Sequence, residues 1–211
     1  MGKKMYLTTV PLGSNIKLSP PAAGFPIQCQ GFSMEIHRLA FPISELLAST
    51  ATPEDEITVI AVRQTNKDPA ADCNYALLKN ELELVHPNCT VRSICISEDQ
   101  SAETLLALFK QLLEAFPDEP ATCYADITFG TKMMSIILFQ ALSCVHQLSN
   151  GVDIDRIIYR EVLRHWAPEL NRSVDDAWNY YNITSIFHCS SIAALAAGSN
   201  GRSFLLSLLN A

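Results

Sequence analysis

The clearest structural signal in this chain is Ala-Thr-Cys-Tyr-Ala-Asp-Ile-Thr-Phe-Gly-Thr-Lys-Met-Met-Ser at residues 121–135. Residues 122–127 are mostly apolar or β-favouring, which predicts a buried strand. Gly130 then marks a turn, and residues 131–148 carry few polar side chains and are predicted to form a helix. We therefore expect a buried strand, a tight turn and a helix in direct succession.

The same alternation of strand and helix runs along the chain on both sides of this stretch. Strands buried on both faces read as unbroken β-branched runs, as residues 57–62 do. Strands are predicted at residues 5–10, 57–62, 91–96 and 154–162, and helices at residues 42–51, 71–85 and 101–116. This rhythm predicts an α/β, Rossmann-like fold with a mostly parallel sheet and helices on both faces.

The remaining segments are less regular. Residues 11–26 are polar and rich in proline, so they are expected to form a long loop. Residues 27–41 alternate weakly, which suits an irregular hairpin. Near the C-terminus we expect a short strand at residues 183–187, followed by a helix of small residues that ends at the break Gly198-Ser-Asn-Gly201.

We expect a single domain over residues 1–211. The chain has 211 residues, of which 48% are hydrophobic and 18% charged, so it is long enough to bury a core and is not a disordered protein. The core is predicted to span residues 5–162. Residues 163–211 are expected to complete the domain or to serve in dimerisation.

The charge and the residue counts restrict the partners. A net charge of −7 repels bulk DNA or RNA and anionic membranes, so a polyanion must meet a locally positive pocket.

The five histidines lack the H-x-x-x-H spacing, and neither a metal nor another cofactor is expected. The seven irregularly spaced cysteines are interpreted as buried thiols of a reducing compartment. With no apolar N-terminal segment long enough for a signal peptide or membrane span, we expect a cytoplasmic protein.

A binding site is predicted where the first strand (residues 5–10) and the fourth strand in chain order (residues 122–127) would lie side by side. At such a topological switch point, ligands bind outside the carboxyl ends of the strands. The loops in question are residues 8–13 and 126–132. Arg63 ends the second strand at the same edge, where it would steady a ligand phosphate or pair with a surface carboxylate. The candidate ligand-binding residues are Thr8, Thr9, Val10, Arg63, Asp126, Thr128, Phe129, Gly130, Thr131 and Lys132.

The second of these loops carries groups that suit an anion. Free backbone N–H groups at a helix N-terminus, the hydroxyls of Thr128 and Thr131 and the ammonium group of Lys132 would converge beside Gly130. The Walker spacing is absent, and no G-x-G-x-x-G follows the first strand. A purely structural interpretation is equally open, in which the threonines cap the helix, the glycine eases the turn and the lysine is a solvated charge.

Residues 124–135 also resemble a known motif. Tyr-Ala-Asp-Ile-Thr-Phe-Gly-Thr-Lys-Met-Met-Ser is similar to the D-[ILV]-T-x-G-T-K-x-M motif of CARF domains, the CRISPR-associated Rossmann-fold sensors of cyclic oligoadenylate. Outside the motif, the resemblance covers the first strand ending in Thr8-Thr9 and the α/β order to about residue 162. Phe129 stands where many family members have a small residue, a difference that would change how an adenine packs beside the turn.

The resemblance implies a ligand and a partner. A CARF domain of a prokaryotic type III CRISPR defence system would bind cyclic tetra- or hexa-adenylate in a groove shared by the two subunits of a homodimer. It would act alone or as the sensor part of a longer effector. The helix at residues 131–148 is apolar around most of its circumference, which requires cover by the sheet alone or also by a second subunit.

Two other functions fit the same pocket. A metal-independent ring nuclease would cleave the ligand by attack of a ribose 2′-hydroxyl on the adjacent phosphate, leaving linear products that end in a 2′,3′-cyclic phosphate. Its catalytic candidates would be Thr9 and Lys132. A Rossmann-like nucleotide or metabolite binder is the third possibility.

Arg160-Glu-Val-Leu-Arg-His165 fits the R-x4-H pattern of HEPN ribonucleases. The arginine falls at the end of a predicted strand rather than in a long helix, and the chain that follows is too short for a helical bundle. We interpret this match as accidental.

Overall fold

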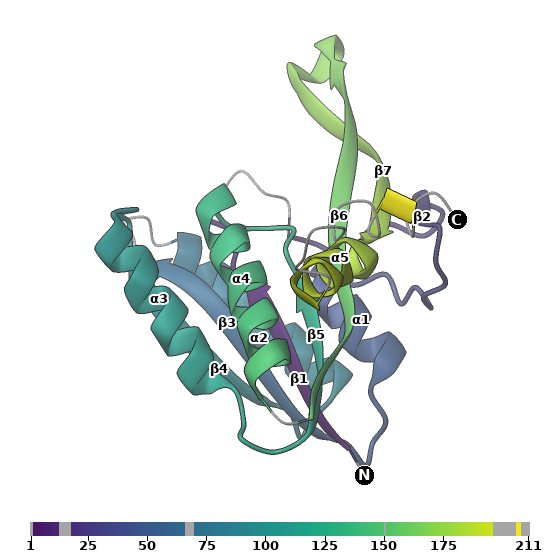
Figure 1. Cartoon of the computed structure of the whole chain (residues 1–211). Helices are drawn as coiled ribbons and strands as arrows, with labels where there is room; N and C mark the ends of the chain where they lie inside the picture. The colour runs from purple at the N-terminus through teal and green to yellow at the C-terminus, as the bar shows by residue number, and fades with distance from the viewer. Residues whose placement is uncertain (1, 13–17, 66–69, 150, 196–205, 208–211) are drawn as a thin grey trace.

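The chain folds around one seven-stranded sheet with helices against it (Figure 1). The computed structural model describes residues 2–12, 18–65, 70–149, 151–195 and 206–207. The α/β fold class predicted from the sequence is confirmed. Its elements are β1 (Lys3–Thr9), β2 (Ile27–Gln30), α1 (Pro42–Thr50), β3 (Glu56–Thr65), α2 (Ala70–Val85), β4 (Thr90–Ser97), α3 (Ala102–Ala115), β5 (Ala121–Asp126), α4 (Lys132–Leu148), β6 (Val152–Ala167), the 3-10 helix η1 (Pro168–Leu170), β7 (Arg172–Asn182) and α5 (Thr184–Leu195).

The strand order places β1 at a topological switch point. The order across the sheet is β2-β7-β6-β5-β1-β3-β4, and every pairing is parallel except that of β6 with β7. The chain builds outward from β1 through β3 to β4, and then crosses to β5 on the other side of β1. The predicted adjacency of the first strand and the strand before Gly130 is confirmed, with Lys4 opposite Thr122 and Thr8 opposite Asp126.

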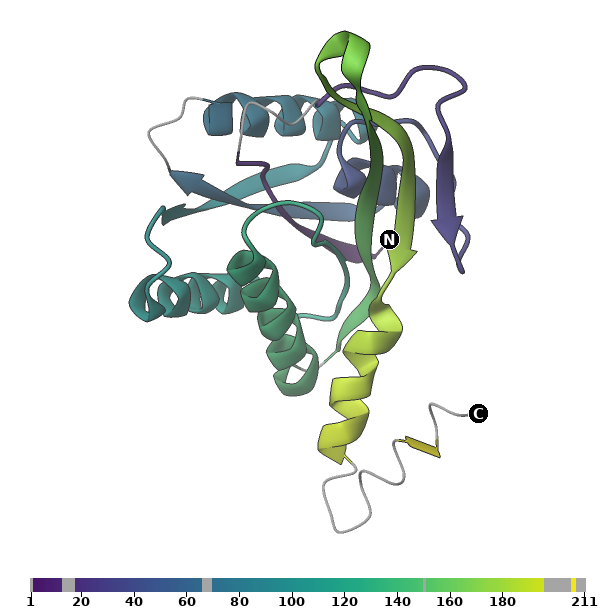
Figure 2. The same ribbon diagram turned by 90° about the horizontal axis from the view of Figure 1, so that it is seen from above.

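Helices cover both faces of the sheet, with α1 and α2 on one face and α3, α4 and α5 on the other (Figure 2). Successive side chains of a strand point to opposite faces, and β1 shows the consequence. Leu7 belongs to the same buried cluster as Leu138 of α4 and Phe187 of α5, whereas Tyr6 belongs to a cluster with Leu47 of α1. We call these the α4-side core and the α1-side core.

Two predictions outside the central series are wrong. Residues 27–41 do not form a hairpin, because only β2 is a strand and it pairs in parallel with β7. Residues 183–187 are not a strand, because α5 begins at Thr184. There the side chain of Asn182 accepts hydrogen bonds from the backbone N–H of Thr184 at 3.0 Å and from its hydroxyl at 2.6 Å. Short apolar runs fit a strand or a buried helix equally, and this local bonding favours the helix.

The predicted small-residue helix is described only as far as the end of α5. The predicted break at residues 198–201 lies outside the described residues, as does Gly13 of the first candidate loop.

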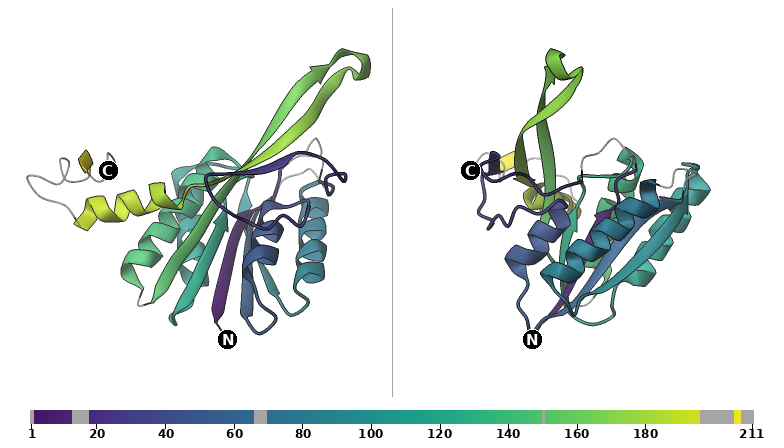
Figure 3. Two further views of the ribbon diagram at one scale, coloured as in Figure 1. Left: turned by 90° about the vertical axis from the view of Figure 1, so that its right-hand side faces the viewer. Right: turned by 180° about the vertical axis from the view of Figure 1, so that it is seen from behind.

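β6 and β7 form a hairpin that rises well beyond the body of the sheet (Figure 3). The sequence predicted a strand only at residues 154–162, but β6 continues to Ala167 and β7 returns antiparallel to it. We call residues 163–177 the arm. A projecting hairpin has solvent on both faces, so its strands lack the apolar pattern that would reveal them in the sequence.

Arg160 anchors the base of the arm to the body. Its side chain is buried, its Nη1 donates a hydrogen bond to the carbonyl oxygen of Ala40 at 2.9 Å, and its guanidinium lies 3.9 Å from the centroid of the Trp178 ring. His165 instead lies in the arm, with its Nδ1 2.5 Å from a carboxylate oxygen of Asp176. The arginine of the R-x4-H match thus packs in the core of a sheet protein, which agrees with an accidental match.

Two carboxylates hold the irregular segment that leads into α1. Glu45, which is fully buried, accepts hydrogen bonds from the backbone N–H groups of His37 at 2.7 Å and Leu39 at 2.6 Å. Glu81 of α2 accepts bonds from the next two backbone N–H groups along the chain, at 2.7 Å and 3.0 Å. Burial raises the pKa of Glu45, although the two backbone donors oppose this effect. These carboxylates supply the acceptors that a strand or helix would otherwise provide.

Replacing Glu45 with leucine is expected to lower the free energy of unfolding by about 2–5 kcal/mol, because two inward-facing N–H groups lose their acceptor. Urea denaturation would measure this loss. Glu83→Leu is the matched control: that side chain is 47% exposed and, in the described ranges, pairs only with Lys79, so its loss should cost less than about 1 kcal/mol. Equal losses in the two variants would contradict the assigned role of Glu45.

Candidate functional site

Hydrogen bonds join the carboxyl ends of β1 and β5 at the switch point. The Thr8 hydroxyl donates to Oδ2 of Asp126 at 3.0 Å, and the Thr9 hydroxyl donates to the carbonyl oxygen of Phe129. Both threonine side chains are buried, with 1% exposed surface each. Val10, also buried, continues this edge by donating its backbone N–H to the carbonyl oxygen of Val62 at 2.8 Å. The two predicted loops therefore form one connected unit.

Asp126 organises the start of the turn. It is completely buried, and its Oδ1 accepts the backbone N–H of Thr128 at 2.9 Å, which bends the chain directly after β5. Burial raises the pKa of this carboxyl, while its bonds to Thr128 and Thr8 and the charge of Arg160 oppose the shift. Thr128 in turn accepts, on its hydroxyl oxygen, the backbone N–H of Arg160 at 2.9 Å. The turn is thereby tied to both β1 and β6.

Position 130 requires a glycine for two reasons, its backbone conformation and its close contact with Thr9. Its φ is +85°, a conformation that residues with a side chain rarely adopt. A Cβ built at this position would lie 3.0 Å from Cβ of Thr9 and 3.1 Å from its hydroxyl oxygen. The glycine lets the turn fold back against the end of β1.

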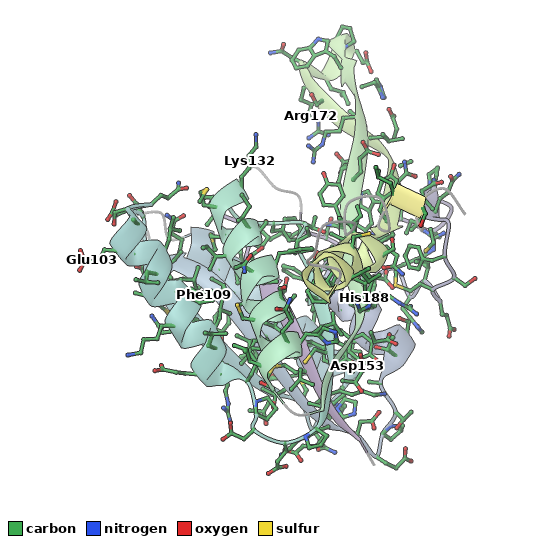
Figure 4. The ribbon with its side chains drawn as sticks, viewed as in Figure 1. Glu103, Phe109, Lys132, Asp153, Arg172 and His188 are labelled. Atoms are coloured by element: carbon green, nitrogen blue, oxygen red, sulfur yellow. The ribbon has the colours of Figure 1, made fainter. Side chains whose placement is uncertain are left out.

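The turn ends in the N-terminus of α4, which faces outward. Thr131 caps the helix by accepting the backbone N–H of Met134 on its hydroxyl oxygen at 3.3 Å. Among the described residues, the backbone N–H groups of Lys132 and Met133 have no acceptor, and the Lys132 ammonium has no carboxylate partner. Lys132 is exposed and projects from the end of α4 on the side toward which the arm rises (Figure 4). Within the described part of the chain, this end of α4 therefore presents backbone donors and a positive charge without partners.

Phe129 turns away from this surface. Its side chain is 8% exposed and belongs to the α1-side core, where it packs edge-on against Phe41 at a centroid distance of 6.4 Å. The guanidinium of Arg160 lies 5.4 Å from its ring centroid. The residue that departs from the CARF pattern thus fills the interior, and its carbonyl oxygen is bonded to the buried Thr9 hydroxyl.

Arg63 is directed to the other face of the sheet. Its Nη1 lies 2.6 Å from a carboxylate oxygen of Asp72, and its guanidinium lies over the ring of Tyr75, both in α2. Lys132 begins α4 on the opposite face, so the structure does not bring these two cations together. Of the two roles considered for Arg63, the pairing with a surface carboxylate is the one present.

An aromatic pair missed by the sequence analysis lies next to the turn. Tyr159 of β6 and Tyr181 of β7 are directly opposite each other in the hairpin, with ring centroids 6.4 Å apart and ring planes 28° apart. Tyr159 is 40% exposed. Residues 180–181 read Tyr-Tyr in the sequence, but only the pairing of β6 with β7 places one of them beside Tyr159.

A cavity of about 600 Å³ lies elsewhere, between β2, the segment after it, the end of α1 and β6. None of the residues that line it was predicted as a site residue. Its lining residues are Ile27, Cys29, Phe32, Ser33, Met34, Glu35, Ile36, Ser49, Thr50 and Arg156.

Within the described part of the chain, no three metal-ligating side chains gather at one place, and no helix is long and apolar enough to cross a membrane. The cysteines are all unpaired, but the prediction that they are buried is confirmed only for Cys123. Four are half-buried (Cys29, Cys89, Cys144 and Cys189), and Cys73 and Cys95 are exposed.

A scan against protein-family models finds no match to this chain, and a search of curated proteins finds no match either.

The buried carboxyl of Asp126 yields a prediction about pH. Because its pKa is raised in the folded state, the native protein retains a proton that the unfolded chain has lost once the pH exceeds the ordinary value of about 4. Between the ordinary and the raised pKa, this residue therefore makes the wild-type protein less stable as the pH rises.

Asp126→Asn removes the titration but keeps an oxygen that can accept the N–H of Thr128. The stability of this variant relative to the wild type should rise with pH across that interval, as measured by urea denaturation from about pH 4 to pH 8. Asp118→Asn, at an exposed position, is the control. A stability difference between Asp126→Asn and the wild type that does not change with pH would contradict the prediction.

Proposed function

We propose that this chain is a CARF domain that binds cyclic oligoadenylate, acting as a homodimeric sensor in the cytoplasm of a prokaryote with type III CRISPR defence. The observation that carries the proposal is the turn from Thr128 to Lys132. Its residues match the CARF motif, and it lies at the switch point where α/β proteins bind ligands. Its outer surface presents the Lys132 ammonium and the N–H groups of Lys132 and Met133, which have no acceptor among the residues that the structure describes.

Electrostatics supports a phosphate at this turn. The chain carries a net charge of −7, and most of its surface repels an anionic ligand. Lys132 stands at the positive end of the α4 dipole with no carboxylate partner among the described residues, so the local field is of the opposite sign. A phosphodiester is then drawn to this turn rather than to the rest of the surface.

The surface of α4 supports a two-fold arrangement. Its inner residues, including Leu138 and Leu142, are fully buried, but Met133 is 36% exposed and Ile136 is 57% exposed. These two apolar side chains lie within the first turns of α4, directly after Lys132. A second copy that covers them would bring its own Thr128–Lys132 turn close to the first, which suits a ligand with two-fold symmetry.

Cleavage of the ligand receives no such support from the geometry. Thr9, the catalytic candidate of the ring-nuclease alternative, is buried and its hydroxyl already donates to the carbonyl oxygen of Phe129. Binding requires only the outward-facing groups of the turn. We therefore propose a sensor rather than a nuclease.

Lys132→Ala is expected to weaken the binding of cyclic tetra- or hexa-adenylate by about 10- to 150-fold, because a charge-assisted contact contributes roughly 1.5–3 kcal/mol. Titration calorimetry would measure the affinity. Lys110→Ala is the matched control, since this α3 lysine is 75% exposed and, among the described residues, forms an ion pair only with Glu114 one turn away. Equal affinities for the wild type and Lys132→Ala would refute the phosphate site.

An incubation of the wild-type protein with the same ligand distinguishes a sensor from a nuclease. After long incubation with excess wild-type protein, mass spectrometry should recover the ring intact. Linear products that end in a 2′,3′-cyclic phosphate would contradict the sensor and would identify the protein as a ring nuclease.

The ligand-free chain is expected to be a dimer, and Ile136→Glu should convert it to a monomer, because burying an unpaired carboxylate at an interface is costly. Light scattering would distinguish 23.3 kDa from twice that mass. Leu84→Glu on α2 is the control, since Leu84 is 84% exposed and α2 covers the face of the sheet opposite to α4. A wild-type protein of monomer mass would contradict the dimer.

A further inference from the structure

The second structural feature at this edge of the sheet is the stacked pair of Tyr159 and Tyr181. Tyr159 follows directly on Ile158, whose carbonyl oxygen accepts the backbone N–H of Ile127, and precedes Arg160, whose N–H bonds to Thr128. The tyrosine is therefore the immediate neighbour, on β6, of the first residues of the turn.

The face on which Tyr159 lies follows from the strand's alternation. Ile157 belongs to the α4-side core and Ile158 to the α1-side core. Tyr159 then points to the α4 side, as Ile157 does. Lys132 begins α4 on that same side and at that same end of the sheet. The aromatic pair and the free donors of the turn therefore face one solvent-exposed corner.

The pair is held in place before any ligand arrives. The Tyr181 hydroxyl donates to Oε2 of Glu161 at 2.9 Å, and the side-chain amide of Asn179 contacts the same oxygen at 3.5 Å. The bond to the carboxylate raises the pKa of Tyr181. An aromatic surface that is already oriented loses little conformational entropy when a second ring stacks on it.

The charges on the two sides of this corner differ in sign. The turn offers the Lys132 ammonium and backbone N–H groups, whereas the aromatic side carries the Glu161 carboxylate. A phosphate is attracted to the first and repelled by the second. A neutral aromatic ring has the opposite preference, since it gains from stacking on tyrosine and is not repelled by a carboxylate.

We infer that Tyr159 and Tyr181 form a base-stacking platform for an adenine of the nucleotide whose phosphate is bound at the Lys132 turn. This inference rests on the proposed function, because it needs a nucleotide at that turn. The β6–β7 hairpin then contributes the base-binding wall of the site, and α4 contributes the phosphate-binding wall.

The test compares the affinity of variants for cyclic tetra- and hexa-adenylate. Tyr159→Leu should weaken binding by about 5- to 150-fold, the range found when a stacking aromatic is removed, whereas Tyr159→Phe should bind as the wild type does. Leu163→Ala is the matched control, because Leu163 lies on the same strand and is 41% exposed against 40% for Tyr159. Near-ultraviolet circular dichroism would check that each variant is folded.

A second measurement does not depend on how the variants fold. In the complex of wild-type protein with the ring, stacking on tyrosine should shift the adenine H2 and H8 resonances of one or more bases upfield. If no adenine resonance moves upfield in the wild-type complex, the platform is refuted.

The outcomes separate the two proposals. If Lys132→Ala loses binding while Tyr159→Leu retains wild-type affinity, the platform alone is wrong. If the wild-type protein binds neither ring, the proposed function fails and the platform fails with it.

Discussion

The parallel pairing of β1 with β5 at the centre of the sheet is the constraint on which the candidate site depends. It brings Thr8 opposite Asp126 and so allows the hydroxyl–carboxylate bond between them. The chain must leave these two neighbouring strands in opposite directions, which opens the edge above them. Without that pairing, Gly130 would have no β1 end to approach, and the N-terminus of α4 would not face the corner beside the arm.

The central fold was predictable from sequence because its strands are buried on both faces and its helices on one. Apolar residues such as Ile57, Val59 and Ile60 are buried in the core, and their unbroken run predicts a strand of a parallel sheet. The β6–β7 hairpin was not predictable beyond residue 162, since its outer strands carry Arg164, His165 and other polar residues that face water on both sides. The antiparallel pairing of β6 with β7 holds it together.

The position of the candidate turn at the end of β5 was predictable, but the direction of its side chains was not. Strand alternation and the glycine turn sufficed to locate residues 126–132. They did not show that Phe129 fills the α1-side core, because that depends on Phe41 and Arg160 from distant parts of the chain. Tyr159 was missed for the same reason, since its place beside Thr128 follows from the pairing of β5 with β6 rather than from any local pattern.

The sequence left two interpretations of the turn open, one structural and one ligand-binding, and the structure shows which of its residues are buried and bonded and which face outward. Thr8, Thr9 and Asp126 are buried and bond to one another or to the turn's backbone, so their task is to build the turn. Lys132 and the N–H groups at the start of α4 face outward and lack partners among the described residues. Groups that such a bonded interior positions in advance would lose little entropy on binding a ligand.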